Sequence, residues 1–323
     1  MLRQGLGAST GAHSCFMPYH VDAVTLSPHG DGWQDEMALG RVVEGTFRSL
    51  NNLLEHLHQS FFFYLLMHRE RFVSIGTYLP SAMLVAANFT IMAVFLWFKA
   101  GQTEAEAEAD SKSKDEKTAE APRPPVPKPA QRDLLAPLCF VALCHFLGVV
   151  PLYLFNHLPE GLLVPFFFVF ACFNAAFPRL ASILLTSRYR LTLQQYQLIH
   201  SFSLLLLGMF VACLATLNFS LAFWIGLLCS PLPFFRPSAG AASSSPLGYY
   251  LNGLPLQTLV SVPVVVLACC YIWGLDLGDV LRDAAFAWNV WGTYTPLVVW
   301  CVWWPAWLAS SVVLSGGPML KKA

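Results

Sequence analysis

The chain has 323 residues, of which 56% are hydrophobic and only 12% are charged, against about 25% charged in an ordinary soluble domain. Residues 1–134 hold 27 of the 38 charged side chains, whereas residues 135–320 hold nine. So few charges over such a length leave too little polar surface for a soluble fold. Composition therefore predicts an all-α polytopic membrane protein. The formal net charge of zero gives no basic field and argues against nucleic acid as a partner.

Apolar stretches of about 20 residues, the length needed to cross a bilayer as a helix, predict seven transmembrane helices, with six as the alternative. The predicted spans are residues 75–98, 134–155, 161–186, 196–217, 219–235, 250–275 and 288–314. Only Leu217 and Asn218 separate the fourth span from the fifth. These two are therefore either a tight hairpin or one broken helix.

Lysine and arginine in the short loops predict the orientation, because cytosolic loops carry the excess of positive charge. One set of loops holds twelve basic residues, seven of them between Lys99 and Arg132, and the opposite set holds only Arg282. This asymmetry places residues 99–133 and the C-terminus in the cytosol and residues 1–74 on the lumenal side. No signal sequence precedes that lumenal segment, so we expect a further upstream region with a span of its own.

The polar first part of the chain predicts three kinds of segment. Apolar side chains recur at spacings of three and four from Leu39 to Phe61 and continue into a wholly apolar run at 61–66. Residues 38–66 are therefore predicted to form an amphipathic helix on the membrane surface, against a partner or against a missing part of its own domain. Residues 16–26 alternate in part and predict one strand, the end of a lumenal α/β domain. Residues 99–133 are acidic and then proline-rich, which predicts a disordered cytosolic linker.

Together these patterns predict six regions. They are a remnant of a lumenal domain (1–37), a lumenal interfacial helix (38–72), a transmembrane helix (73–98), a cytosolic linker (99–133), a bundle of about six transmembrane helices (134–316) and a cytosolic tail (317–323).

Motifs for catalysis, metals or cofactors are weak. Eight of the nine cysteines lie in apolar runs, where a thiol behaves as a small hydrophobe, and no metal-ligand spacing occurs. We therefore predict no catalytic residue, no metal and no cofactor. A membrane enzyme that uses the charged cluster at 276–283 is one rival hypothesis. A polytopic lipid or small-solute transporter is another, although the spans lack the rows of charged residues that usually mark transport pathways. The polar groups within the spans are Asn174, Arg179, His145 and His200.

The last predicted span is unusual because it contains two prolines and a group of tryptophans. Pro296 and Pro305 are each expected to remove a helical hydrogen bond and to kink the helix. The tryptophans that surround Pro305 are Trp300, Trp303, Trp304 and Trp307. The kink predicts a gap that a lipid could occupy, and the alternative is a kinked packing helix with an aromatic belt.

Several segments resemble one protein family. RSLNNLLEHLHQSFFFYLL (48–66), followed by RFVSIGTYLP (71–80), closely resembles a segment of the Gaa family, the GPI-anchor attachment subunit of GPI transamidase. Three further segments are similar to parts of that family: HSCFMPYHVDAVTL (13–26), TLNFSLAF (216–223) and YTPLVVWCVWWPAW (294–307).

The resemblance implies a multi-pass protein of the endoplasmic reticulum membrane in a complex that joins GPI lipids to precursor proteins. Family members carry a lumenal domain similar to M28-type zinc peptidases, most of which has no counterpart in this chain. The cysteine-protease subunit cleaves the precursor, and the resemblance implies that the Gaa-type subunit holds the GPI lipid or presents its amine. The resemblance thus implies a non-catalytic GPI-lipid-binding and assembly subunit, with that protease, other transamidase subunits and the membrane as partners.

Two sets of residues are the predicted contacts. The GPI or lipid contacts are Pro305, Pro296, Trp303, Trp304 and Trp307. The lumenal interface contacts are His58, Gln59, Ser60 and Tyr64.

Overall fold

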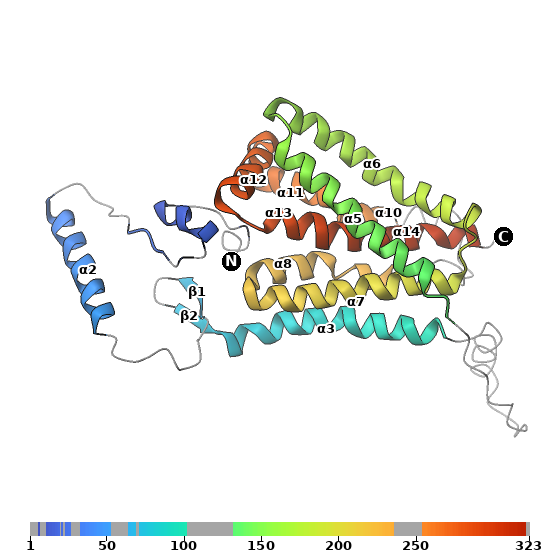
Figure 1. The fold of residues 1–323 in the computed structure, drawn as a ribbon, viewed down its shortest axis with the longest axis horizontal. Coiled ribbons are helices and arrows are strands. Elements are labelled where there is room, and N and C mark those ends of the chain that lie inside the picture. Colours follow the sequence, from blue (N-terminus) through green and yellow to red (C-terminus); the bar gives the residue numbers. More distant parts are fainter. Residues whose placement is uncertain are drawn as a thin grey trace, which may run out of the picture.

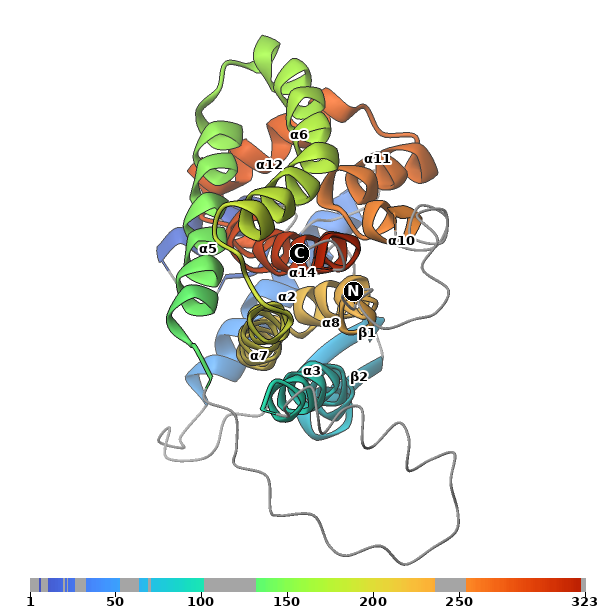
Figure 2. The same cartoon turned by 90° about the vertical axis from the view of Figure 1, so that its right-hand side faces the viewer.

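The computed structural model describes residue 6 and residues 11–19, 21, 23–26, 33–52, 64–68, 71–101, 132–235 and 254–320. Most of these residues form a bundle of helices that run along the long axis of the molecule (Figure 1). Seen end-on in Figure 2, helix α14 (Trp304–Leu320) lies in the middle of the bundle and the other helices surround it. The predicted cytosolic linker falls mostly on residues 102–131, outside the described part.

The described residues contain five helices that are long and apolar enough to cross a membrane. They are α3 (Ile75–Lys99), α5 (Leu135–His157), α6 (Glu160–Ser187), α7 (Leu193–Leu217) and the last helix, Thr295–Gly316 within α13 and α14. A sixth span results if the bent pair α11 and α12 is counted as one. The helical membrane architecture is confirmed, and a seventh span is not.

The predicted fifth span is a short helix rather than a full crossing. Helix α8 (Phe219–Cys229) has only 11 residues and is followed by the 3-10 turn η2 (Leu232–Phe234). Asn218 begins α8, because its side-chain oxygen accepts a hydrogen bond from the Leu221 amide at 3.0 Å. α8 turns back along α7 (Figure 1). The sequence left open whether the fourth and fifth predicted spans form a tight hairpin or one broken helix, and the structure shows the tight hairpin.

The predicted sixth span is broken and then bent. Helix α10 (Leu254–Leu259) is followed by α11 (Val262–Trp273), and α12 (Leu277–Trp291) turns away from α11 by 113°. Gly274 ends α11 with a φ of +62°, a conformation that glycine adopts without strain. Asp276 then begins α12, because its carboxylate accepts a hydrogen bond from the Asp279 amide at 3.1 Å.

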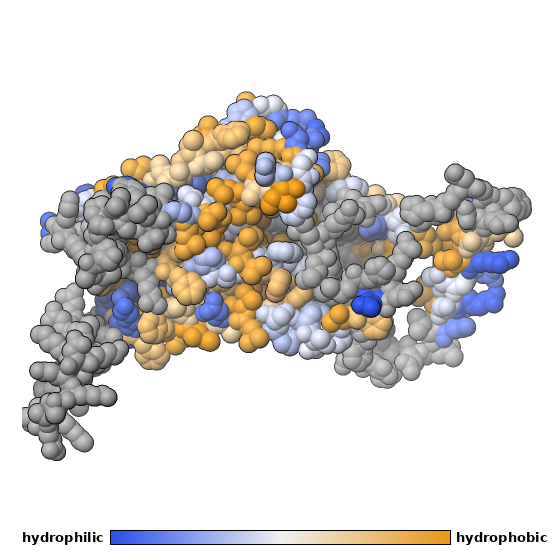
Figure 3. Space-filling model, turned by 180° about the vertical axis from the view of Figure 1, so that it is seen from behind, coloured by the Kyte–Doolittle hydropathy of each residue, from blue (hydrophilic) through white to orange (hydrophobic). Residues whose placement is uncertain are grey.

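Helices α3 and α7 pack closely through small side chains. Gly208 of α7 lies against α3, where an added Cβ would be 3.1 Å from the Ala86 carbonyl oxygen. Ser201 of α7 donates a hydrogen bond to the Ala93 carbonyl at 2.7 Å. Small residues let backbones approach, and such packing and hydrogen bonds are what hold helices together in lipid. The outer faces of the helices carry exposed apolar side chains, which form a broad hydrophobic surface over the bundle (Figure 3).

The N-terminal part differs from the prediction in two places. The predicted strand at 16–26 is wrong for its described residues, which include the end of the 3-10 helix η1 (Ala12–Tyr19). A lone strand has no partner for its backbone groups, and here the Thr25 hydroxyl instead accepts from the His13 amide at 2.9 Å. The predicted helix 38–66 begins earlier and ends earlier, as α2 (Trp33–Asn51). Its predicted last residues are strand, not helix.

That strand, β1 (Tyr64–His68), pairs antiparallel with β2 (Arg71–Ser74). In the register, Tyr64 lies opposite Ser74 and Leu66 opposite Phe72. Aromatic residues such as Tyr64 and Phe72 favour strands, and the pairing gives each strand a hydrogen-bonded neighbour. β2 runs directly into α3.

Candidate functional site

The last membrane helix begins at Thr295, seven residues later than predicted, and holds both prolines of the candidate site. Pro296 lies in the first turn of α13 (Thr295–Val298), where a missing N–H removes no helical hydrogen bond. The predicted kink at Pro296 is therefore wrong. Val299–Trp303, called η4, forms a π-helix between α13 and α14.

Pro305 follows this π-helix. Because proline has no backbone N–H, two carbonyls earlier in the helix lack their usual helical donor. The Trp304 amide donates to the Val299 carbonyl, five residues earlier. The next residue, Pro305, cannot donate to the carbonyls of Trp300 and Cys301, which are five and four residues earlier. Such π-bulges absorb a local irregularity in an α-helix and are frequent at functional sites.

Helix α5 covers both of these carbonyls. The His145 Nδ1 lies 3.0 Å from the Cys301 carbonyl oxygen, and because a carbonyl can only accept, the ring nitrogen donates. One turn further along α5, a Cβ added at Gly148 would collide with the Trp300 carbonyl oxygen and would lie 3.3 Å from the Pro305 Cγ. Glycine at 148 thus lets α5 approach the proline segment. The space beside Pro305 on this side is filled by protein.

Two buried tryptophans tie α14 to its neighbours through their ring N–H groups. Trp304 is 1% exposed and donates to Asn174 Oδ1 of α6 at 2.6 Å. Trp307 is also 1% exposed and donates to the Gln257 carbonyl of α10 at 2.8 Å. Buried indole N–H groups need such partners, since an unmade hydrogen bond inside the protein is costly. These two bonds fix the rotation of α14 in the bundle.

The other aromatic side chains of the segment pack into one cluster. The Trp300 ring is stacked on Phe155 of α5, with centroids 5.0 Å apart, and meets Phe170 of α6 edge-on at 5.2 Å. Trp303 is 3% exposed, and its ring N–H has no hydrogen-bond partner among the described residues. The predicted lipid contacts Pro296, Trp303, Trp304, Pro305 and Trp307 are therefore all buried within the bundle.

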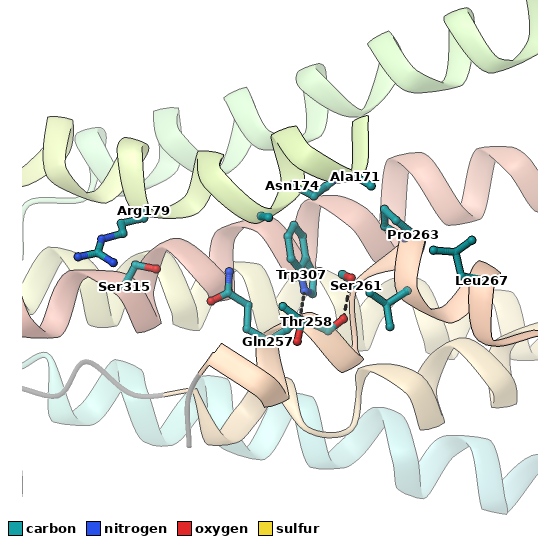
Figure 4. A pocket seen from close by; sticks show the side chains of 12 residues that line it. Ala171, Asn174, Arg179, Gln257, Thr258, Ser261, Pro263, Leu267, Trp307 and Ser315 are labelled. Atoms are coloured by element: carbon teal, nitrogen blue, oxygen red, sulfur yellow. Dashed lines mark hydrogen bonds between the residues drawn. The ribbon is translucent and has the colours of Figure 1, made fainter. Parts of the chain in front are cut away.

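A cavity of about 190 Å³ lies on the other side of the last helix, between α6, α10, α11 and α14. Of the five predicted lipid contacts, Trp307 lines it. Figure 4 shows Arg179 and Ser315 at one end of this cavity, Gln257 and Thr258 in the middle, and Pro263 and Leu267 toward the other end. The cavity therefore changes from polar to apolar along its length.

The predicted lumenal contacts are not placed. His58, Gln59 and Ser60 lie outside the described residues, and of Tyr64 only the backbone, in β1, is described. In the charged cluster at 276–283, Asp276 begins α12 and Asp279 accepts a hydrogen bond from Arg282 at 2.6 Å. Among the residues that the structure describes, no three His, Cys, Asp or Glu side chains are grouped as metal ligands.

Comparison with known proteins gives a family match over most of the chain. The family model described as "Gaa1-like, GPI transamidase component" matches residues 1–311. The GPI transamidase component gaa1 of Schizosaccharomyces pombe is 32% identical over 236 residues, which are 72% of this chain and 34% of that protein. The GPI transamidase component GAA1 of Saccharomyces cerevisiae is 46% identical over 82 residues, 25% of this chain and 13% of that protein.

The matched region thus covers about a third of the length of the S. pombe relative. The resemblance seen in the quoted segments is confirmed at the level of the family. The chain belongs to the Gaa1-like family of GPI transamidase components.

Proposed function

We propose that this chain is a non-catalytic subunit of GPI transamidase, which holds the lipid part of GPI at its last membrane helix. The names of its relatives support a role in GPI attachment, and the position of the last helix supports the lipid role. Proposed partners are the other transamidase subunits, including the cysteine-protease subunit, and the GPI lipid itself. The lumenal contacts, from His58 to Tyr64, are proposed to lie beside those subunits.

The proposed location is the endoplasmic reticulum membrane, with residues 1–74 lumenal and the C-terminus cytosolic. The structure supports a common side for the basic loops, because the end of α3 and the start of α5 lie beside the start of α7. Gln194 donates to the Ala100 carbonyl at 2.7 Å, and Gln195 donates to Asp133 at 2.8 Å. The Arg132 guanidinium lies over the Trp97 ring, 4.6 Å from its centroid. Under the positive-inside rule this end is cytosolic, and α12 is at the lumenal end.

The length of the proline and tryptophan segment carries the lipid proposal, because it matches the depth of a single leaflet. From Pro296 to Trp307 the helix rises about 17 Å at 1.5 Å per residue, roughly half of a hydrocarbon core of about 30 Å. The segment starts beside α12, which packs against α5, where Asn289 donates to the Asn156 carbonyl at 3.0 Å. Because the prolines and tryptophans are buried, GPI chains that enter from the lumenal leaflet would run along the exposed side of this segment, where Leu297 lies. Pro305 would set the packing of the helix at the depth where the chains end.

Replacing Pro305 by leucine tests this proposal. A donor N–H at 305 removes the reason for the π-helix and shifts α14 against α5, so GPI recovered with the complex should fall about tenfold, the effect of about 1.4 kcal/mol in binding. Recovery of the partner subunits should not change. The measurement is GPI and subunit recovery after affinity purification of the full complex.

Pro80→Leu is the matched control, because Pro80 is an exposed proline inside α3 and its replacement should leave GPI recovery intact. Unchanged GPI recovery with Pro305→Leu would contradict the proposed role of the last helix. Loss of the partner subunits together with GPI would show a role in assembly instead.

A further inference from the structure

The cavity beside Trp307 has a charged end that the proposed GPI contact does not use. Arg179 of α6 and Ser315 of α14 line this end, and both lie on the far side of Trp307 from α12 (Figures 1 and 4). From Trp307 to Ser315, α14 rises about 12 Å. The charged end therefore lies beyond the leaflet-deep segment from Pro296 to Trp307.

The depth of Arg179 can be measured along α6 from the level of α12. Gly278 of α12 lies near the start of α6, where its added Cβ would be 3.5 Å from Val164. Helix α6 rises about 22 Å from Val164 to Arg179. In a hydrocarbon core of about 30 Å, Arg179 is thus in the leaflet opposite to α12, close enough to its surface for the long side chain to reach the headgroups.

The lining of the cavity suits a phosphate at one end and an acyl chain at the other. A guanidinium makes charge-assisted, often bidentate hydrogen bonds to phosphate, and the Ser315 hydroxyl lies at the same end (Figure 4). Ala171, Val264 and Leu267 offer an apolar wall farther along. At about 190 Å³ the cavity is smaller than the roughly 300 Å³ of the smallest usual ligand pockets. It fits part of a ligand whose remainder lies in the bilayer.

We propose that this cavity binds a phospholipid of the leaflet opposite to α12, with its phosphate at Arg179 and Ser315 and the upper part of one acyl chain along α6 and α11. The phosphate end of the site lies in the opposite leaflet from the proposed GPI contact, and the two sites share only Trp307. Such a lipid would fill the space between α6 and α11 and support α10, whose Gln257 carbonyl holds Trp307.

Labelling with a lipid probe tests the proposal on the whole complex reconstituted in vesicles. The probe is phosphatidylserine with a diazirine in its acyl chain, and the readout is the amount of label on peptides from α6 and α11. Arg179→Gln should lower this label about tenfold, as expected for the loss of a charge-assisted hydrogen bond, and Arg179→Lys should lower it less. Ala175→Phe, which fills the cavity, should also remove the label.

Two matched controls keep the result specific. Arg282→Gln removes an arginine at the α12 end of the bundle, and Ala176→Phe adds the same bulk at the exposed neighbour of Ala175, which does not line the cavity. Both should keep the label. Thermal unfolding of each variant checks that it is folded, and if Arg179→Gln fails to fold, Ala175→Phe still decides the outcome.

Three results would overturn the proposal. The first is label on α6 and α11 that neither Arg179→Gln nor Ala175→Phe lowers. The second is loss of label when excess inorganic phosphate is added, which would assign the charged end to a free anion. The third is loss of label when GPI lipid is added, which would assign the cavity to GPI. Failure of the GPI proposal alone would leave the phospholipid label unchanged.

Discussion

Leucine at position 148 is expected to destabilise the bundle by about 2–3 kcal/mol, the upper range for an overpacked core. Gly148 has no room for a side chain, because an added Cβ would collide with the Trp300 carbonyl oxygen and reach the Pro305 ring at 3.3 Å. A larger residue must push α5 away from the π-helix and break the stacking of Phe155 on Trp300. The measurement is the free energy of unfolding in detergent, by denaturant titration.

Gly161→Leu is the control for this prediction. Gly161 is a glycine in the first turn of membrane helix α6. An added Cβ there meets nothing within 4 Å, so the same substitution should change stability by less than about 0.5 kcal/mol. The loss of stability caused by Gly148→Ala should lie between those caused by Gly148→Leu and Gly161→Leu. Its steric cost is offset by the higher helix propensity of alanine, which is worth about 1 kcal/mol. Equal effects at 148 and 161 would refute the close contact of α5 with the proline segment.

His145→Leu is also expected to lower the free energy of unfolding, and the size of this change should depend on the residue at position 305. With proline at 305, the Cys301 carbonyl accepts from His145 at 3.0 Å, and loss of that donor at this half-buried position should cost about 1–3 kcal/mol. With Pro305→Ala, the new amide at 305 can donate to the Cys301 carbonyl four residues earlier. The cost of His145→Leu should then fall below about 0.5 kcal/mol. A double-mutant cycle with unfolding free energies measures this coupling.

His157→Leu supplies the comparison within the same helix. His157 also lies near a carbonyl, that of Tyr153 at 2.9 Å, but this bond is on its own helix at an exposed position. Its loss should be nearly neutral and should be the same with proline or alanine at 305. A cost for His145→Leu that is equal in both backgrounds would show that His145 does not replace the hydrogen bond that Pro305 lacks.

Long apolar runs made the first four spans predictable from sequence to within a few residues, because a run of that length in lipid has to be helical. The second half of the bundle was less predictable, because its helices are short and bent. Gly274 ends α11, and Asp276 begins α12 only two residues later. Apolar content alone therefore did not mark α12 as a separate helix. Strand β1 was missed because its first residues belong to the apolar run at 61–66, which was assigned to the preceding helix.

The candidate site shows a similar division. The prolines and tryptophans of the last helix stand out by composition, and the sequence predicted where they lie. It did not predict which helices complete the site. Gly148, Asn174 and Gln257 come from three other helices, and an interaction between residues 130 positions apart, as between Asn174 and Trp304, leaves no local pattern. His145 and Asn174 were visible as polar residues in apolar spans, which was the one available signal.

Cross-linking of GPI tests the central proposal most directly. The reconstituted transamidase complex would be labelled with a GPI lipid that carries a diazirine in its acyl chain, and the labelled peptides of this chain would be mapped. We expect label on the last helix between Thr295 and Trp307, and we expect Pro305→Leu to lower it while Pro80→Leu does not. Label that is absent from the last helix and found only on other helices or other subunits would contradict the proposal.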